Sequence, residues 1–292
     1  SFMRNILIPA DFSTAAWNAT KYALQLFAES KCVFHFLNAY TPELYSNRLM
    51  AGRIAETSKT CSAQLASEKG LQKTLNRIKK EYNNPLHTFK SISTFSMLID
   101  EVREVVEQQH IDFVVMSASG AADDDSIFLG RNTVRIINNV DKCPVLVIPA
   151  AVQFTYLQHI SLVSEHNHLF NNDELNPVAK LAKEFNCSVE IASLQNAISP
   201  RSDLQQLNHV TIGSSLRNIV HKIQALNMDT TLTTTLKKYV DQTNCQLIVL
   251  RNGANSYLRN LCNDFIVGKS TFCCNLPMLS LQLSENNISV SQ

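Results

Sequence analysis

Residues 112–149 read DFVVMSASGAADDDSIFLGRNTVRIINNVDKCPVLVIP, and residues 245–282 read CQLIVLRNGANSYLRNLCNDFIVGKSTFCCNLPMLSLQ. The two segments align without a gap. Each begins with an apolar run, passes a glycine (Gly120 or Gly253) and ends with an apolar run that follows a proline. Solenoid repeats recur about every 20–50 residues, so a similarity at this larger separation indicates the tandem duplication of a whole domain.

Outward from these segments, short apolar runs alternate with helical patterns in both halves of the chain. Parallel strands need crossover connections, which are usually helices, so the predicted fold class is α/β, with two tandem five-stranded parallel sheets of the doubly wound type. The predicted domains are residues 1–150 and 151–292. The predicted strands are residues 5–9, 33–37, 88–92, 112–116 and 144–149, then 160–163, 188–194, 225–230, 246–250 and 277–281.

Composition narrows the class of protein. The chain has 292 residues, about twice the common domain size, and 45% of them are apolar, which is enough for two cores. A net charge of +1 leaves no electrostatic footprint for nucleic acid or an anionic membrane. No apolar run approaches the ~18 residues that a membrane helix needs, and no signal-peptide pattern opens the chain, so a cytoplasmic location is expected. The 8 cysteines form no C-x-x-C pair and are interpreted as reduced core residues.

A doubly wound sheet binds ligands beyond the carboxyl ends of its strands, where the strand order reverses. For the order 3-2-1-4-5 that point lies between strands one and four. The loops there are residues 9–11 and residues 117–130, and Gly130 to Thr133 open the helix that follows. Free amides and the positive end of a helix dipole would face the crevice, which suits a phosphate.

These residues resemble the universal stress protein family in its tandem, two-domain form. The family signature after strand four is glycine, two residues, glycine, nine residues, glycine and then serine or threonine, with an aspartate after strand one. Gly120 and Gly130 have this nine-residue spacing, Asp11 stands at the aspartate position, and Cys143–Ile148 is similar to the closing strand. The resemblance covers both halves and implies that the two sheets are of the Rossmann-like (adenine nucleotide alpha hydrolase-like) type. It implies a stress-response regulatory protein that binds ATP or another adenine nucleotide, with Mg²⁺ as a candidate companion ion.

The resemblance also assigns a role to each residue of the first domain. Asp11, in the loop with Pro9 and Ala10, would contact the ribose or adenine, and Met116 and Ser117 would flank the base and sugar. No catalytic residue and no metal ligand are implied. The residues expected around the phosphates are Gly120, Gly130, Arg131, Asn132 and Thr133.

Two residues of the first domain depart from the family pattern. Ser117 replaces the first signature glycine, where a side chain crowds the approach of the backbone to a ligand. Arg131 replaces the serine or threonine, and it could offer phosphate a charged donor or fold away from the site.

The second domain has lost most of the signature. Leucine and acidic residues at these positions oppose anion binding, so this domain is expected to be structural or to bind a partner. The gapless alignment places Leu250 at Ser117, Asn263 at Gly130 and Asp264 at Arg131. Outside that alignment, Glu165 follows the first strand of the second half and corresponds to Asp11.

Three other clusters have two interpretations each. Asp123–Asp125 could hold Mg²⁺ beside a nucleotide, but a solvated loop is favoured. His166 and His168 lack a third metal ligand at a recognisable spacing, which favours a surface loop. Cys273 and Cys274 are expected in the core rather than in redox chemistry.

Three classes of function are therefore open: a nucleotide-binding regulator, a scaffold for protein partners and an enzyme such as a slow ATPase. The absence of paired carboxylates, a nucleophile with its base, or a Walker loop argues against an enzyme. Because the family pairs domains through the last strand, residues 145–148 are expected to meet residues 278–281 in an intramolecular pseudo-dimer. A homodimer of the chain is also compatible with the sequence.

Overall fold

The computed structural model describes residues 3–41, 53–119, 129–165, 168–195, 203–266 and 275–282. The N-terminal half contains β1 (Arg4–Pro9), α1 (Thr14–Leu26), β2 (Cys32–Tyr40), α2 (Arg53–Glu81), β3 (His87–Phe95), α3 (Leu98–Gln108), β4 (Phe113–Ser117), α4 (Arg131–Asn139) and β5 (Val145–Ile148). The C-terminal half contains β6 (His159–Ser164), α5 (Asn172–Glu184), β7 (Ser188–Gln195), α6 (Asp203–Ser215), β8 (His221–Asn227), α7 (Leu232–Gln242), β9 (Leu247–Asn252), α8 (Tyr257–Ile266) and β10 (Met278–Gln282).

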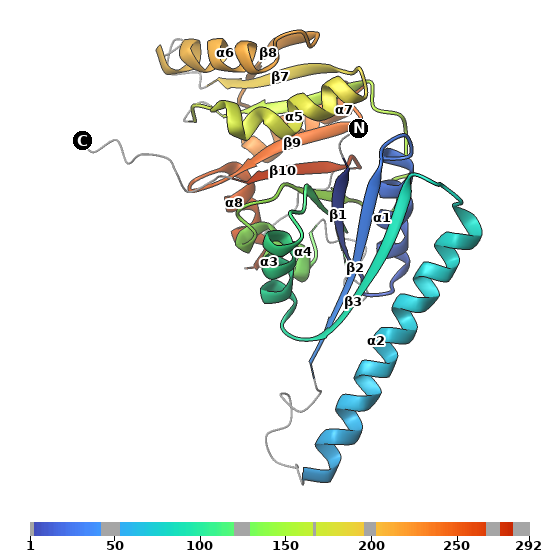
Figure 1. Ribbon diagram of the computed structural model, residues 1–292. Helices are drawn as coiled ribbons and strands as arrows, with labels where there is room; N and C mark the ends of the chain where they lie inside the picture. The colour runs from blue at the N-terminus through green and yellow to red at the C-terminus, as the bar shows by residue number, and fades with distance from the viewer. Residues whose placement is uncertain are drawn as a thin grey trace.

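The strands form one ten-stranded sheet in the order β3-β2-β1-β4-β5-β10-β9-β6-β7-β8 (Figure 1). Each half has the predicted order 3-2-1-4-5, and its strands are parallel. The predicted α/β fold class is confirmed. The point where the strand order reverses lies between β1 and β4 in the first half and between β6 and β9 in the second.

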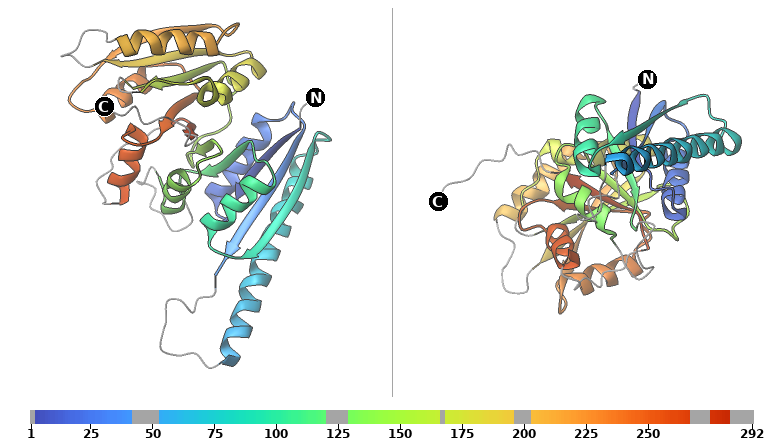
Figure 2. Two further views of the ribbon diagram at one scale, coloured as in Figure 1. Left: turned by 60° about the vertical axis from the view of Figure 1, so that its left-hand side comes forward. Right: turned by 90° about the horizontal axis from the view of Figure 1, so that it is seen from below.

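The two halves are joined through β5 and β10, which pair antiparallel with Leu146 opposite Leu279. The expected meeting of these two strands is confirmed. Because each strand would otherwise be a free edge, this pairing removes two open edges from the sheet. At the same junction α4 and α8 lie side by side (Figure 2), and Asn252 Nδ2 donates to the Ile137 carbonyl at 2.6 Å.

Helices cover both faces of the sheet, in three layers. One core lies under α1, α2, α5 and α6, and the other lies under α3, α4, α7 and α8. Successive residues of β1 alternate between the cores: Ile6 and Ile8 point to the first, and Leu7 points to the second. A strand that is buried on both faces has a continuous run of apolar residues. The apolar runs in the sequence therefore marked the positions of the buried strands reliably.

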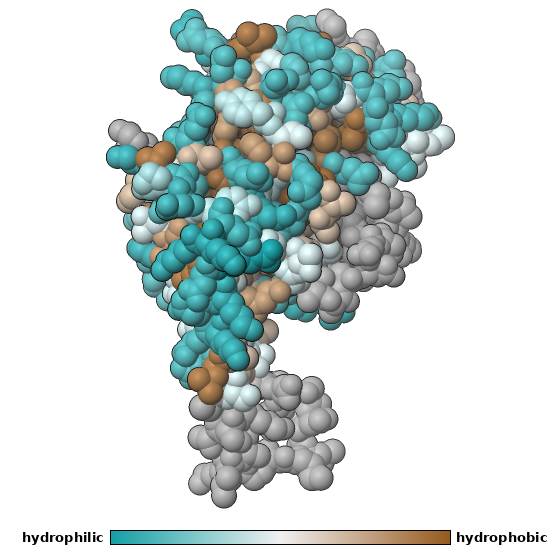
Figure 3. All heavy atoms as spheres, turned by 90° about the vertical axis from the view of Figure 1, so that its right-hand side faces the viewer, coloured by the Kyte–Doolittle hydropathy of each residue, from teal (hydrophilic) through white to brown (hydrophobic). Residues whose placement is uncertain are grey.

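Helix α2 is long and rich in lysine, and it agrees with the lysine-rich helix that the sequence predicts over residues 57–82. Leu71 and Ile78 anchor it on the sheet, and its outward surface is mainly hydrophilic (Figure 3). The sequence predicts a lid or an irregular loop for the polar residues 41–55. Residues 53–55 belong to α2 instead, and residues 42–52 lie outside the described residues. None of the described helices is long and apolar enough to span a bilayer.

Strand β8 is the clearest departure from the predicted elements, because it covers residues 221–227 instead of 225–230. Leu226 is its one half-buried residue, and the others are exposed. An exposed edge strand has no apolar run to mark its ends, so its position depends on backbone pairing with β7, from His221 opposite Val189 to Asn227 opposite Gln195.

The cysteines that the structure describes in full are free and buried, which confirms their interpretation as core residues. Burial raises the pKa of the Cys32 thiol to about 12 and that of Cys187 to about 11, so these thiols are protonated and unreactive near neutral pH. The set is Cys32, Cys143, Cys187, Cys245 and Cys262.

His35 on β2 makes stability sensitive to acid. Its side chain is buried, its Nε2 lies 3.1 Å from Asn5 Oδ1, and burial, with Lys90 nearby, lowers its pKa from 6.5 to about 4. Between pH 6.5 and 4, the His35 imidazole therefore binds a proton in the unfolded chain but stays neutral in the folded chain. Stability is unaffected above pH 6.5 and falls as the pH drops toward 4.

We expect His35→Gln, which keeps a hydrogen-bond donor but does not titrate, to remove part of this loss. The difference between the free energies of unfolding at pH 7 and pH 4.5, from urea titrations, should shrink by about 1–3 kcal/mol relative to the parent chain. Equal differences in the two proteins would assign the acid sensitivity to other groups, such as His87, whose pKa burial also lowers.

Candidate functional site

A cavity of about 100 Å³ lies at the carboxyl ends of β1 and β4, at the point predicted for a ligand. It gathers residues from loops that are far apart in the sequence. Among the residues assigned from the sequence, those that line it are Pro9, Ala10, Asp11, Met116, Ser117, Asn132 and Thr133.

The loop after β1 holds Asp11 in a tight turn. The Ser13 amide donates to Asp11 Oδ1 at 3.0 Å, and Ser13 Oγ in turn caps α1 by accepting from the Ala16 amide at 3.0 Å. Asn38, at the end of β2, donates to the Ala10 carbonyl at 2.7 Å. These local bonds explain why the D-x-S pattern after an apolar strand places a carboxylate at the mouth of the cavity.

The other wall is the turn from β4 to α4. Thr133 Oγ1 donates to the Ser117 carbonyl at 3.0 Å, and the Gly130 amide donates to the Ala118 carbonyl at 2.6 Å. These bonds hold the start of α4 against the end of β4. Amides in the first turn of a helix have no carbonyl partner within the helix, so the positive end of α4 is presented beside the cavity.

Ser117 does not leave the open approach that the family glycine provides. Its Oγ donates to the Ser119 carbonyl at 2.6 Å, and the residue is buried. Among the described lining residues Asp11 alone is charged. A phosphate here would therefore depend on the α4 amides and on Arg131, whose side chain is exposed at the helix start and does not line the cavity.

The cavity is small for a nucleotide. Small-molecule sites usually have volumes of about 300–1,000 Å³, so the described residues would enclose only part of such a ligand. Gly120 and Asp123–Asp125 lie outside the described residues. Gly130 is described as the N-cap residue of α4, not as part of the cavity lining.

Sequence reasoning missed four residues that line the cavity. Asn38 had a usable signal, because it is a polar residue at the carboxyl end of β2, the strand next to β1. The other three residues had no such signal. The four residues are Asn38, Ala39, Leu98 and Ser119.

Strand register corrects the alignment of the two halves. The Val114 amide donates to the Pro144 carbonyl, whereas the equivalent bond in the second half runs from the Ile248 amide to the Pro277 carbonyl. The fourth strand is therefore shifted by one residue from the gapless alignment. Arg251, not Leu250, occupies the position of Ser117. The gapless alignment was wrong here because both faces of these strands are apolar. A shift by one residue exchanges the two faces, and the sequence of such a strand does not reveal the shift.

The start of α8 corrects a second assignment. This helix begins at Tyr257, so Asn263 and Asp264 lie within it and do not correspond to Gly130 and Arg131. Ser256 occupies the N-cap position, where its Oγ accepts from the Arg259 amide at 3.1 Å. An acidic residue at the helix start is therefore not what distinguishes the second half.

In the second half, the side chain of Glu165 occupies the position that corresponds to the ligand site of the first half. It follows β6 as Asp11 follows β1, and its carboxylate oxygens accept from the Tyr257 amide at 3.2 and 3.3 Å, at the N-terminus of α8. Arg251 Nη2 lies 3.5 Å from Glu165 Oε2, with exposed side-chain fractions of 5% and 8%. The chain's own carboxylate thus occupies the place where an external anion would meet the helix dipole.

Of the remaining clusters, the structure describes only His168, which pairs with a glutamate. His168 Nε2 lies 3.1 Å from Glu174 Oε2, and this glutamate also completes the capping box of α5. Within the described ranges, no group of three or more His, Cys, Asp or Glu side chains could hold a metal ion. His166, Cys273 and Cys274 lie outside those ranges.

Comparisons with known proteins agree with this fold. The model of the universal stress protein family matches residues 3–149. A universal stress protein from Archaeoglobus fulgidus DSM 4304 aligns over 97% of both chains with a TM-score of 0.63 and 13% identity. PA1789, a functionally unknown protein from Pseudomonas aeruginosa PAO1, covers 96% of this chain and 92% of its own, with a TM-score of 0.53 and 8% identity. No curated protein matches the sequence.

Proposed function

The chain belongs to the universal stress protein family, and from this premise we propose that it is a stress-response regulator whose N-terminal half binds ATP or another adenine nucleotide. The proposed role is regulatory binding, not catalysis, and the proposed location is the cytoplasm. Mg²⁺ would accompany a triphosphate.

The observation that carries this proposal is the convergence of Asp11, Asn132 and Thr133 on one cavity beside the N-terminus of α4. A carboxylate can accept hydrogen bonds from ribose hydroxyls or the adenine amino group, and helix amides can bind phosphate oxygens. The two kinds of group come from different elements, the loop after β1 and the start of α4, which suits a ligand with two chemically different ends such as a nucleotide.

The second half contributes no equivalent site to the proposal, because Glu165 already occupies the N-terminus of α8. We therefore propose one nucleotide per chain. The C-terminal half would serve as a structural partner or contact other proteins.

Calorimetric titration of the full chain with ATP, ADP and AMP tests the proposal. We expect saturable binding with a stoichiometry of one, and tighter binding of nucleotides with more phosphates. A stoichiometry of two would contradict the assignment to one half. No binding at millimolar nucleotide would refute nucleotide recognition and leave a scaffold for protein partners as the preferred function.

A further inference from the structure

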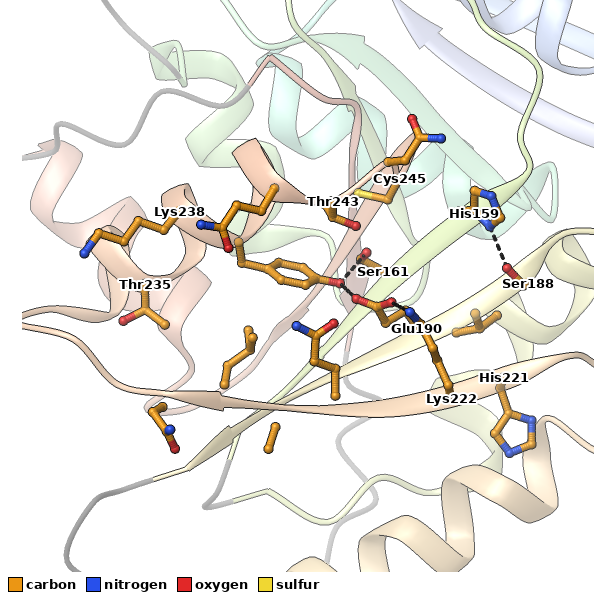
Figure 4. Close-up of a pocket in the computed structure, with 18 of the residues that line it drawn as sticks. His159, Ser161, Ser188, Glu190, His221, Lys222, Thr235, Lys238, Thr243 and Cys245 are labelled. Carbon is orange, nitrogen blue, oxygen red and sulfur yellow. Dashed lines mark hydrogen bonds and ion pairs between the residues drawn. The ribbon is translucent and has the colours of Figure 1, made fainter.

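A larger cavity, of about 740 Å³, lies in the C-terminal half, away from the carboxyl ends of β6 and β9. It is a groove between α7 and the face of β6, β7 and β8 (Figure 4). Its volume is within the usual range for small-molecule sites. Nothing in the proposed nucleotide function uses it.

The floor of this groove is a chain of hydrogen bonds centred on Tyr239. Its hydroxyl donates to Glu190 Oε1 at 2.7 Å and lies 2.7 Å from Ser161 Oγ. On the other side of the carboxylate, Lys222 Nζ lies 2.5 Å from Glu190 Oε2. In Figure 4, Ser161, Glu190 and Lys222 lie close together in the groove.

The fold does not require this polar network. Strand and helix registers place Leu7 at the position of Ser161 and Val105 at that of Tyr239 in the N-terminal half, where both are buried apolar residues. Burying a polar group costs free energy unless the group is hydrogen-bonded, and an apolar side chain has no such cost. An apolar pair would therefore stabilise the core as well as Ser161 and Tyr239 do. The exchange indicates a role for the network beyond packing.

The burial of the charged groups shows which charge the groove would bind. Glu190 is held in the floor by Tyr239 and its side chain is 14% exposed, whereas that of Lys222 is 72% exposed on an edge strand. The other lysine that lines the groove, Lys238, is also exposed and pairs with Asp229. The fixed charge is therefore negative, and its present counter-ion is a flexible side chain that can swing into solvent at little cost.

We propose that this groove binds a small organic cation, a primary amine or a guanidinium with an apolar body. Its cationic group replaces Lys222 Nζ on Glu190, and its apolar part lies along Leu226 and the ring of Tyr239. Of the roughly four acceptor positions on the carboxylate, about three remain for such a ligand after the bond from Tyr239, and a guanidinium fills two of them bidentately. The inference stands independently of nucleotide binding in the other half.

The full chain is titrated with butylamine, 1,4-diaminobutane and agmatine, with 1-butanol and butyrate as neutral and anionic controls, and binding is followed by ligand-observed NMR or calorimetry. We expect the amines and agmatine to bind and the controls not to bind. Glu190→Gln, which still accepts from Tyr239, should weaken binding about tenfold or more.

Lys222→Ala provides the decisive comparison, because a cationic ligand and an anionic ligand predict opposite changes in affinity. Removing a competing cation should tighten amine binding severalfold, and this exposed side chain can be truncated without loss of the fold. Weaker amine binding in Lys222→Ala, binding of butyrate, or no amine binding at millimolar concentration would each overturn the proposal. Lys142→Ala, which removes an equally exposed lysine paired with Glu107 in the other half, is the matched control and should leave amine affinity unchanged.

Discussion

Gly130→Asp is expected to abolish ATP binding, with a loss of affinity of about a hundredfold or more. The substitution places a carboxylate beside the first amides of α4, where the phosphates would lie, and it therefore competes with them and repels them. Gly130 has φ −68° and ψ 161°, an extended conformation that any residue adopts. Aspartate is a favoured N-cap residue, so helix α4 should be retained.

Gly130→Asn is the control for the negative charge, because it has nearly the same size and also caps helices. It should bind ATP at least tenfold more tightly than the aspartate variant. Calorimetry measures both affinities, and circular dichroism checks that the fold is intact. If the aspartate variant bound ATP with the affinity of the parent chain, the phosphates could not lie at the start of α4.

Glu165→Gln is expected to destabilise the protein by about 3–5 kcal/mol, because it leaves Arg251 as a buried charge without its counter-ion. The substitution also weakens the acceptor at the N-terminus of α8. For a chain of this size the thermal midpoint should fall by about 5–8 °C. Differential scanning calorimetry measures the shift.

The double variant Glu165→Gln, Arg251→Met separates charge from packing. With both charges removed, no uncompensated ion is left, and replacing a buried ion pair by apolar groups is often neutral. We expect most of the lost stability to return, as a coupling of about 1 kcal/mol or more in the double-mutant cycle. A single variant as stable as the parent would mean that the ion pair contributes nothing.

The two halves illustrate two uses of one topology. In the first half the end of β1 presents Asp11 to an open cavity, whereas in the second half the longer Glu165 reaches the start of α8 and meets Arg251. Glu165 is one methylene longer than Asp11, and its contacts with the Tyr257 amide and Arg251 let the chain supply its own anion. The groove beside Tyr239 lies on a different surface, so loss of the first kind of site does not prevent a second kind from forming.

The sequence by itself determined the duplication, the α/β class and the loops that meet at the first cavity. Apolar runs and helical periodicity are local signals, and the rule that parallel strands end at the same edge converts them into the position of Asp11, Ser117 and Thr133. The pairing of β5 with β10 was also predictable, through the family resemblance.

The tertiary structure alone decided the alignment of β9 with β4, the start of α8 and the two polar networks of the second half. Each depends on which side chains from distant segments come within about 3 Å, and so on hydrogen-bond register and helix phase. A strand that is apolar on both faces looks the same in sequence when it slips by one residue. In three dimensions that slip decides whether Leu250 or Arg251 meets Glu165, because neighbouring residues of a strand point to opposite faces.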